Sequence, residues 1–554
     1  MPITPSFSLS QDDEFVRVRL VVPYVRVTSA EVICDGHDFS FYCHPYLLKL
    51  TFPCLLDGDD EERCKAVYNP DEDHGTIVAS LPKRTRGELF PDLDLTTLLM
   101  QRRKEKDFGG ASVSGSASIE VLCSTQTNPA GEDEEEERGG GFAEREFIGA
   151  PPLLTSIPHY GFGLKYSNMF RSFREELVEM TELEEPDQVG ESSRRVLRLE
   201  AEDRLFDPER YLGDYFGAES DALFLDAMAY EPFWSLEWKA RRSTASATAS
   251  ATATSGPAAS ENDSSSASGS YFSESEEATL KELPNREYIF IPVSPEEKGE
   301  LLGLADILYS FCFEFRCTGG ELSVESPHNI TRLSALLSWL DAYNQPDDDA
   351  MKVIVSAARR SLIYPYVRHW KLVRKVLADV AKVLYLGKRC ILRCLLQCHS
   401  LMAHTDSHYM LNKIFLDDYC VWIQRLRPES IKQLADEINA AKGRIEAMEQ
   451  AGRGIVELRL PELEAWALEQ LGADEDAVPE VLPDVPAELY PKPRPRPRPR
   501  VPEQSSPPPL PPAILEIVPP QRTLLDQEPT ITITPQDQPR TLIQVISSKD
   551  EGEN

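Results

Sequence analysis

The sequence predicts a multidomain protein in which an N-terminal antiparallel β-sandwich is followed by a larger all-α domain. Apolar residues recur at every second position through the first hundred residues, which is typical of strands with one buried face. Further along, the apolar period becomes that of amphipathic helices. Segments with neither period separate and follow these regions. The predicted division is a sandwich at 1–101, a linker at 102–152, a helical domain at 153–475 with an insertion at 240–276, and a tail at 476–554.

The sandwich prediction rests on five to seven short alternating runs. The clearest contains Val16, Val18, Leu20 and Val22. Turn signals such as Asp35-Gly36 separate the runs, so the antiparallel connections are short. A chain of about 100 residues with this spacing of strands is typical of a β-sandwich.

The linker and the insertion have compositions that bury little apolar surface. Residues 102–152 are rich in Gly, Ser and Glu and include an acidic run at 132–137. Residues 240–276 are mostly Ser, Thr and Ala. We predict that both are disordered, because neither supplies enough apolar area to offset the entropy of ordering.

The helical domain is clearest after Ser294, where Ser-Pro-Glu-Glu predicts a helix start with proline at the first helical position. Apolar residues from Leu301 to Phe315 follow at helical spacing, and Gly319-Gly320 predicts the end. Similar patterns predict about ten helices in all and no strand in this region. The other expected helices cover roughly 166–183, 219–230, 329–343, 350–363, 366–385, 388–403, 414–426 and 428–450.

The tail is proline-rich, and Pro alternates with Lys or Arg up to Arg500. Such a sequence favours polyproline II. We predict that the tail is disordered and interpret it as a spacer; the alternative is a segment that docks on an aromatic groove or an acidic surface.

Composition limits the classes of partner and compartment. There are 58 Lys and Arg against 92 Asp and Glu, for a formal net charge of −34, which disfavours nucleic acid as the main ligand and favours a basic partner. We expect no membrane span and no secretory signal, and the 11 cysteines include no C-x-x-C pair. The expected location is therefore the nucleus and the cytoplasm, with reduced thiols.

Motifs of catalysis and of nucleotide or metal binding are missing from the sequence. The nearest metal-like group is Cys390, Cys394, Cys398 and His399 on one predicted helix. Thiols one helical turn apart diverge too far to close a tetrahedral shell alone, so we interpret them as core residues. We expect no enzyme activity, no cofactor and no metal site.

Ten Lys and Arg residues occur between Arg359 and Arg393 with one acid, Asp379, among them. Because aromatic residues interleave with these cations, RNA contact is one interpretation. The other, which we prefer given the net charge, is that the cations are solvated or paired between helices. A second dense motif, His159-Tyr-Gly-Phe-Gly163, is interpreted as the seat of the helical domain rather than as a recognition loop.

Seven separated motifs carry a likeness to a known family. They are VPYVRV at 22–27, GHDFSFYCHPYLLKLTFP at 36–53, HYGFG at 159–163, FDPERYLGDYF at 206–216, YPYVRHWKL at 364–372, LGKRCILRCLL at 386–396 and DDYCVWIQ at 417–424. In these motifs, which occur in the right order, the chain resembles the Shq family of H/ACA ribonucleoprotein assembly factors. The resemblance covers about 1–101 and 155–450, apart from the insertion.

The resemblance implies a CS-like sandwich and a family-specific helical domain without catalytic residues. It also implies a monomeric chaperone that holds a free dyskerin-type pseudouridine synthase as an RNA mimic, by its RNA-binding region and PUA domain, before small-RNA particle assembly. The alternatives are a co-chaperone of the ninety-kilodalton heat-shock chaperone and an RNA-binding protein. Within the matching motifs, an aromatic residue beside a carboxylate suits a basic partner surface, although most such residues are expected to be core or capping residues. The candidate partner-binding residues are Tyr24, Tyr42, Phe206, Asp207, Tyr211, Asp214, Phe216, Asp417, Asp418, Tyr419 and Trp422.

Overall fold

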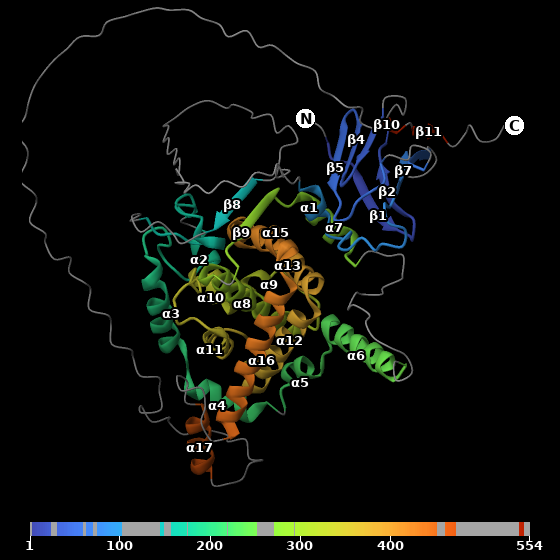
Figure 1. Ribbon diagram of the computed structural model, residues 1–554. Helices are drawn as coiled ribbons and strands as arrows, with labels where there is room; N and C mark the ends of the chain where they lie inside the picture. Colours follow the sequence, from blue (N-terminus) through green and yellow to red (C-terminus); the bar gives the residue numbers. More distant parts are fainter. Residues whose placement is uncertain are drawn as a thin grey trace, which may run out of the picture.

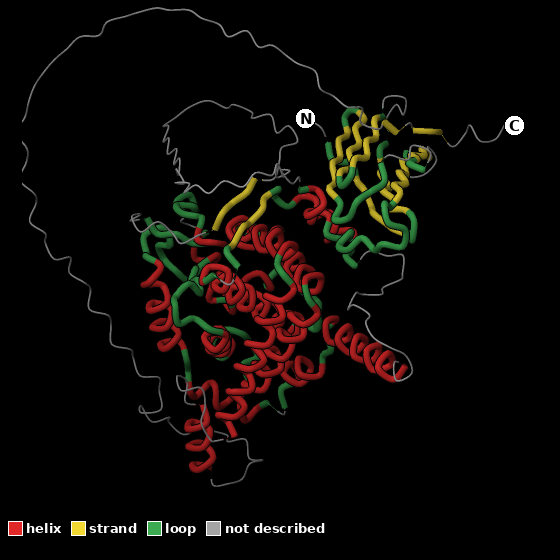
Figure 2. Tube along the Cα trace, in the orientation of Figure 1, coloured by secondary structure: helices red, strands yellow, loops and turns green. Residues whose placement is uncertain are grey.

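The computed structural model contains a small β-sandwich beside a larger helical domain (Figures 1 and 2). Helices predominate in the second domain and strands in the first, as the sequence predicts. The residues that the structure describes are 3–23, 30–58, 63–69, 75–101, 144–148, 157–173, 176–218, 220–251, 271–292, 294–450, 460–471, 542–543 and 545–547.

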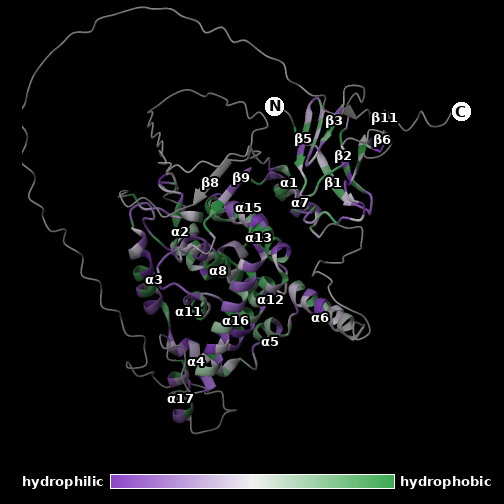
Figure 3. Cartoon of the chain, in the orientation of Figure 1, coloured by the Kyte–Doolittle hydropathy of each residue, from purple (hydrophilic) through white to green (hydrophobic). Residues whose placement is uncertain are grey.

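The sandwich is built from two antiparallel sheets that bury every second residue. One sheet has the order β1 (Ser6–Gln11), β2 (Phe15–Val21), β7 (Thr76–Pro82), β6 (Lys65–Asn69), and the other has β3 (Glu31–Asp35), β4 (Asp38–Cys43), β5 (Tyr46–Thr51). In β2, Val16, Val18 and Leu20 are fully buried between outward-facing neighbours. Hydrophobic and hydrophilic residues accordingly alternate along these strands (Figure 3). The predicted sandwich is confirmed.

Two short strands from the tail extend the sheets of the sandwich. β10 (Leu542–Ile543) pairs antiparallel with β3, and β11 (Val545–Ser547) pairs parallel with β6. No strand is predicted from the sequence in this part of the chain. The rest of the tail beyond Leu471 lies outside the described residues.

The helical domain is assembled around α8 (Pro295–Cys317), most of whose residues are buried. The Ser294 hydroxyl accepts a hydrogen bond from the Glu297 amide at 3.1 Å, and the chain turns away after the helix with positive φ at Gly319 and Gly320, so both predicted ends are confirmed. Within the described residues, no helix has the length and apolar character needed to cross a membrane. The remaining helices are α2 (Leu177–Met180), α3 (Glu191–Leu205), α4 (Pro208–Gly217), α5 (Ala222–Ala229), α6 (Phe233–Ala251), α7 (Glu274–Glu282), α9 (Ser326–Leu333), α10 (Ala335–Trp339), α11 (Ala350–Ser361), α12 (Trp370–Leu386), α13 (Lys388–Ala403), α14 (Tyr409–Leu411), α15 (Asp417–Arg425), α16 (Pro428–Gln450) and α17 (Leu460–Leu471).

Four predictions about this region were wrong in detail. The helix expected over 166–183 is limited to the single turn α2, and the helices α3 and α4 were not predicted from periodicity. A strand is present at β9 (Arg286–Phe290), which pairs in parallel with β8 (Glu144–Ile148) from within the predicted linker. The insertion is shorter than predicted, because α6 continues to Ala251 and α7 begins at Glu274; its centre, 252–270, lies outside the described residues.

The sandwich is fastened to the helical domain by α1 (Thr96–Met100) and the loop before it. The Arg389 guanidinium contacts both oxygens of Asp94 at 2.6 and 3.0 Å and also reaches Asp92 at 3.3 Å. The Thr97 hydroxyl donates to the Leu280 carbonyl in α7. Figure 1 shows α1 and α7 at the junction of the two domains.

A second group of bonds completes this seam at the end of α1. The Leu98 amide donates to Gln424 at 3.2 Å, and the Gln101 side chain joins the Arg286 carbonyl to the Arg425 guanidinium, with both distances 2.9 Å. Bonds from residues 92–101 to α7, β9, α13 and α15 fix the orientation of the sandwich. The two domains are therefore joined by a hydrogen-bonded seam, and each keeps its own hydrophobic core.

We predict that reversing the charge of Arg389 loosens this seam. Arg389→Asp places like charges opposite Asp92 and Asp94, so amide exchange at Thr97 and Leu98 in the full chain is expected to accelerate at least several-fold, while exchange at the centre of β2 stays unchanged. Combining it with Asp94→Arg restores one pair and reverses part of the effect. Arg444→Asp, which removes a long exposed contact to Asp349, is the control. Equal exchange in all variants contradicts the seam.

Candidate partner-binding residues and the buried ion network

Three of the four candidates in DDYCVWIQ lie in the core of the helical domain. Asp418 is fully buried in α15. Its carboxylate accepts a hydrogen bond from Tyr166 at 2.7 Å and one from Tyr288, and it pairs with Lys165 at 3.2 Å and Arg286 at 3.3 Å. Burial raises the pKa of Asp418 against the opposing effect of these donors. Asp418 therefore links α15 to β9 and to the segment that contains Lys165 and Tyr166. Its buried carboxylate is not accessible to a partner.

Tyr419 and Trp422 belong to the same buried cluster. The Tyr419 hydroxyl donates to the Glu300 carboxylate at 2.8 Å, and the Gly163 amide donates to its other oxygen at 2.9 Å. Desolvation raises the pKa of Glu300 to about 7 despite those two hydrogen bonds. The ring of Trp422 packs against Phe162 with centroids 5.5 Å apart.

The glycine motif closes this cluster, which confirms its role as a seat. Gly161 has φ +80°, and a Cβ there would meet the Ile414 carbonyl oxygen at 2.7 Å. Tyr160 and Phe162 on either side are fully buried. The motif therefore buries the rings of Tyr160 and Phe162 at a point where its own backbone passes close to the backbone of Ile414. A side chain at position 161 would prevent this close approach.

Asp417 contacts His399, with 2.8 Å between its carboxylate and Nε2. The helix α15 continues directly from a π-helical turn at 412–416, and no side chain caps its start. The carboxylates of Asp417 and Asp418 therefore do not cap a helix.

The candidates at 206–216 mainly organise α4. Asp207 caps the helix by accepting from the Glu209 amide at 3.0 Å, and Asp214 pairs with Arg368 at 2.8 Å. Phe206 and Tyr211 are buried, and the Tyr211 hydroxyl donates to Glu464 of α17 at 2.5 Å. Phe216 is half-buried against the core.

In the sandwich, the Tyr42 side chain is 43 % exposed on β4, whereas Tyr24 lies outside the described residues. The exposed candidates are thus Tyr42 and Asp207, with Asp214, Phe216 and Asp417 half-buried.

The cations of the predicted basic stripe are largely engaged inside the protein. Arg359 and Arg360 are fully buried, and both contact Glu202 of α3, at 2.6 and 3.0 Å. Arg198 of α3 joins the same carboxylate at 2.9 Å. Further pairs are Arg368–Asp214, Arg374–Glu449, Lys382–Asp379, Arg389–Asp94 and Arg393–Glu276, while Lys371 and Lys375 lie on the exposed side of α12. The preferred interpretation, in which these cations are solvated or paired between helices, is confirmed for most of them; Lys382 pairs within α12.

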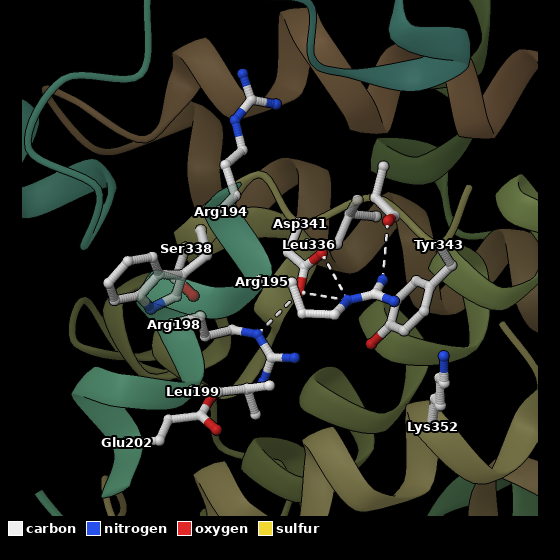
Figure 4. Close-up of polar contacts among 12 residues, drawn as sticks. Arg194, Arg195, Arg198, Leu199, Glu202, Leu336, Ser338, Asp341, Tyr343 and Lys352 are labelled. Atoms are coloured by element: carbon white, nitrogen blue, oxygen red, sulfur yellow. Dashed lines mark hydrogen bonds and ion pairs between the residues drawn. The ribbon is translucent and has the colours of Figure 1, made fainter. Parts of the chain in front are cut away.

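The network continues from Glu202 to a second acid on the loop after α10. Figure 4 shows Arg195 and Arg198 of α3 converging on Asp341, at 3.1 and 2.9 Å. Burial alone would raise the pKa of Glu202, but Arg198, Arg360 and Arg359 outweigh it and hold that pKa at about 2. Glu202 is therefore ionised and fully neutralised within the core.

The cysteine group also lies in the core, as predicted. Cys390, Cys394 and Cys398 are each at most 1 % exposed. Burial raises the pKa of Cys398 to about 12, so this thiol is protonated at neutral pH. Across the described residues, no group of three or more His, Cys, Asp or Glu side chains is arranged to hold a metal ion.

Exposed acids gather instead around α2, in a segment that the sequence analysis did not single out. Glu176, Glu179, Glu184 and Glu185 are exposed, and Val178 among them is 73 % exposed. A run of six acids in the segment ELVEMTELEEPD at 176–187 was the available signal. We call the four exposed glutamates the α2 acidic surface.

Two family models match the chain, one on each domain. The model described as "SHQ1-like, CS domain" matches residues 4–100, and "SHQ1 protein, Shq1 domain" matches residues 261–450. The Protein shq1 of Schizosaccharomyces pombe is 31 % identical, over 79 % of this chain and 92 % of its own length. The chain belongs to the SHQ1 family. SHQ1 family proteins are assembly factors, and the sandwich is a CS domain.

Vertebrate members of the SHQ1 family match over a similar span. The Protein SHQ1 homolog of Xenopus tropicalis is 34 % identical over 78 % of this chain, which spans about two thirds (66 %) of that relative's length. The Protein SHQ1 homolog of Mus musculus is 33 % identical over 84 % of this chain and 75 % of its own length.

The ionisation of Glu300 predicts a dependence of stability on pH. Its pKa in the folded protein is raised above the ordinary value of 4.5, so the stabilisation it contributes is complete below about pH 4.5 and is lost as pH rises through about 7. Glu300→Gln keeps an acceptor for the Gly163 amide without the charge. We expect this variant to raise the free energy of unfolding at pH 8 by about 1–3 kcal/mol and to change it little at pH 5.

Chemical denaturation at the two pH values measures this effect. Glu202→Gln is the opposing control: its carboxylate has a lowered pKa, so its contribution is present above about pH 4.5 and is lost as pH falls toward 2. That variant is expected to lose about 3–5 kcal/mol at pH 8, because it removes the negative charge that three buried guanidinium groups share. An equal effect of Glu300→Gln at both pH values contradicts the assignment.

Proposed function

We propose that this chain is an assembly chaperone that holds a free dyskerin-type pseudouridine synthase in place of RNA before an H/ACA particle forms. The proposal rests on one observation: the chain belongs to the SHQ1 family and is strongly acidic. A client that binds RNA presents a cationic surface, and an acidic protein competes for such a surface. The client holds this chain through its RNA-binding region and PUA domain, in the nucleus and the cytoplasm.

The distribution of charge supports this proposal. Arg359, Arg360 and Arg316 are buried beside carboxylates, so these cations contribute little to the field outside the protein. The α2 acidic surface, in contrast, faces solvent, and the exposed side chain of Val178 lies among its glutamates. A client surface rich in Lys and Arg is attracted by the glutamates and gains an apolar contact at the valine.

The match to a CS domain favours a second candidate function, that of a co-chaperone of the ninety-kilodalton heat-shock chaperone. A pull-down from cell extract treated with nuclease separates the candidates. Recovery of the synthase supports the first function, and stoichiometric recovery of the heat-shock chaperone supports the second.

We predict that the synthase cannot hold guide RNA and this chain at once. Guide RNA titrated into the preformed complex at fixed salt is expected to displace the chain fully, because both ligands occupy one cationic surface. The affinity of the complex is expected to fall with salt less steeply than that of RNA, since apolar contacts are not screened. A stable ternary complex contradicts RNA mimicry.

The double variant Glu184→Gln and Glu185→Gln tests the surface. It is expected to lower the association rate constant for the synthase about 2- to 5-fold at low salt, with a smaller change in the dissociation rate, because exposed charges mainly steer encounter. Glu209→Gln with Asp226→Asn removes two exposed charges elsewhere and is the matched control. Equal association rates for the two double variants exclude this face as the client surface.

A further inference from the structure

An aromatic pair lies beside an exposed carboxylate where three helices meet. Trp238 of α6 and Tyr385 of α12 have ring centroids 5.8 Å apart at an interplanar angle of 31°. The Tyr385 hydroxyl donates to the carboxylate of Asp436 in α16 at 2.6 Å. Both rings are partly buried against the core, and Asp436 is exposed. The helix α12 packs against both α6 and α16, which brings the three side chains together (Figure 1).

A net acidic hollow on α16 lies beside this trio. An open hollow on the outer side of α16 includes Asp436 itself, and its lining contains three acids and one cation. Glu237, which neighbours Trp238, is already engaged by Arg241 at 3.5 Å and Tyr271 at 2.8 Å. The lining residues of the hollow are Glu429, Lys432, Gln433, Asp436, Glu437 and Ala440.

This combination of groups suits one class of ligand. Aromatic side chains at a shallow surface pack against the rings of proline in an extended, polyproline II segment, and acids at the rim pair with Arg or Lys in the same segment. An arginine can also lie over an indole or phenol ring. The site therefore fits a peptide in which proline alternates with cations.

The chain carries such a peptide in its own tail. Residues 491–500 read PKPRPRPRPR, with five cations at alternate positions in a protein of net charge −34. This segment lies outside the described residues. Its charge is opposite to that of the hollow on α16, and the proposed function gives it no role.

The distance along the chain allows the segment to reach the site. The last described helix before it, α17, lies near the C-terminal end of α16, because Glu464 is close enough to Glu449 for the two carboxylates to repel. Asp436 precedes Glu449 by 13 residues of one helix, or about 20 Å along its axis. Residues 472–491, which connect α17 to the first cation, span up to about 70 Å when fully extended.

We propose that Trp238, Tyr385 and Asp436 form a docking site for the proline- and arginine-rich segment 491–500 of the same chain. Prolines contact the Trp238–Tyr385 pair, and arginines pair with Asp436 and the neighbouring glutamates Glu429 and Glu437. Docking keeps this cationic run on an acidic surface of its own chain and away from polyanions such as RNA.

A fluorescent peptide of sequence 489–502 tests the site in the full-length chain. In one variant, Arg494, Arg496, Arg498 and Arg500 are all replaced by Ser, which leaves the site vacant. The labelled peptide is expected to bind this tail-substituted chain at least about 10-fold more tightly than the wild-type chain, where the tethered segment competes at high effective concentration. Fluorescence anisotropy at low salt measures both affinities.

Variants of the site in the tail-substituted background identify the surface. Asp436→Lys changes an exposed residue, and Trp238→Ala removes the indole; each is expected to weaken peptide binding at least about 5-fold. Tyr366→Ala with Glu209→Gln, which alters an aromatic residue and an acid exposed elsewhere, is expected to leave the affinity within about 2-fold. Thermal melts check that each variant is folded.

Three results would overturn the proposal. The first is equal peptide affinity for the wild-type and tail-substituted chains, including absence of binding to both, since the wild-type site would then not be occupied. The second is equal peptide affinity for the Asp436→Lys variant and the control variant. The peptide would then bind through the overall negative charge of the protein and not at this site. The third is a concentration-dependent dimer of the wild-type chain that the serine substitutions abolish, which would place the segment on a second copy.

Discussion

The helical domain depends on the buried carboxylate of Glu202, which three guanidinium groups share. Arg198 approaches it from the same helix, and Arg359 and Arg360 approach it from α11. Taking these ions out of water is costly, and only their mutual contacts and the satisfied hydrogen bonds around them offset that cost. The network therefore specifies how α3 and α11 pack, since any other arrangement would leave a buried charge without a partner.

The same network determines which charges the protein shows to its surroundings. Because Arg359 and Arg360 are enclosed, the part of the sequence that reads as a basic stripe exposes fewer cations than it contains, Lys371 and Lys375 among those that are exposed. Asp418 and Glu300 are the acidic counterparts: tyrosines and cations enclose Asp418, and Glu300 accepts from the Tyr419 hydroxyl and the Gly163 amide. What remains exposed to solvent includes the glutamates of the α2 acidic surface.

The seam between the two domains adds a geometric constraint. The helix α1 has five residues, yet together with the Gln101 cap its side chains and backbone bond to three different elements of the helical domain, α7, α15 and β9. The two domains therefore present their surfaces in a fixed relation. A client that contacts both the CS domain and the helical domain meets a preformed arrangement, which lowers the entropy lost on binding.

The sequence by itself determined the sandwich, the helix α8 and the seating role of HYGFG, because each depends on local periodicity, capping or a glycine backbone. It also indicated the family, since motifs are read directly from residues. The helix α3 was not predicted, because its buried residues are Arg194, Arg198 and Glu202. Its inward face is therefore charged and has no apolar period. Asp418 was predicted to bind a partner because a charged residue is usually exposed, although its carboxylate is buried in the core. Only the tertiary structure decided which charges are paired, because an ion pair between Glu202 and Arg359 joins residues 157 positions apart, a separation that leaves no local signal.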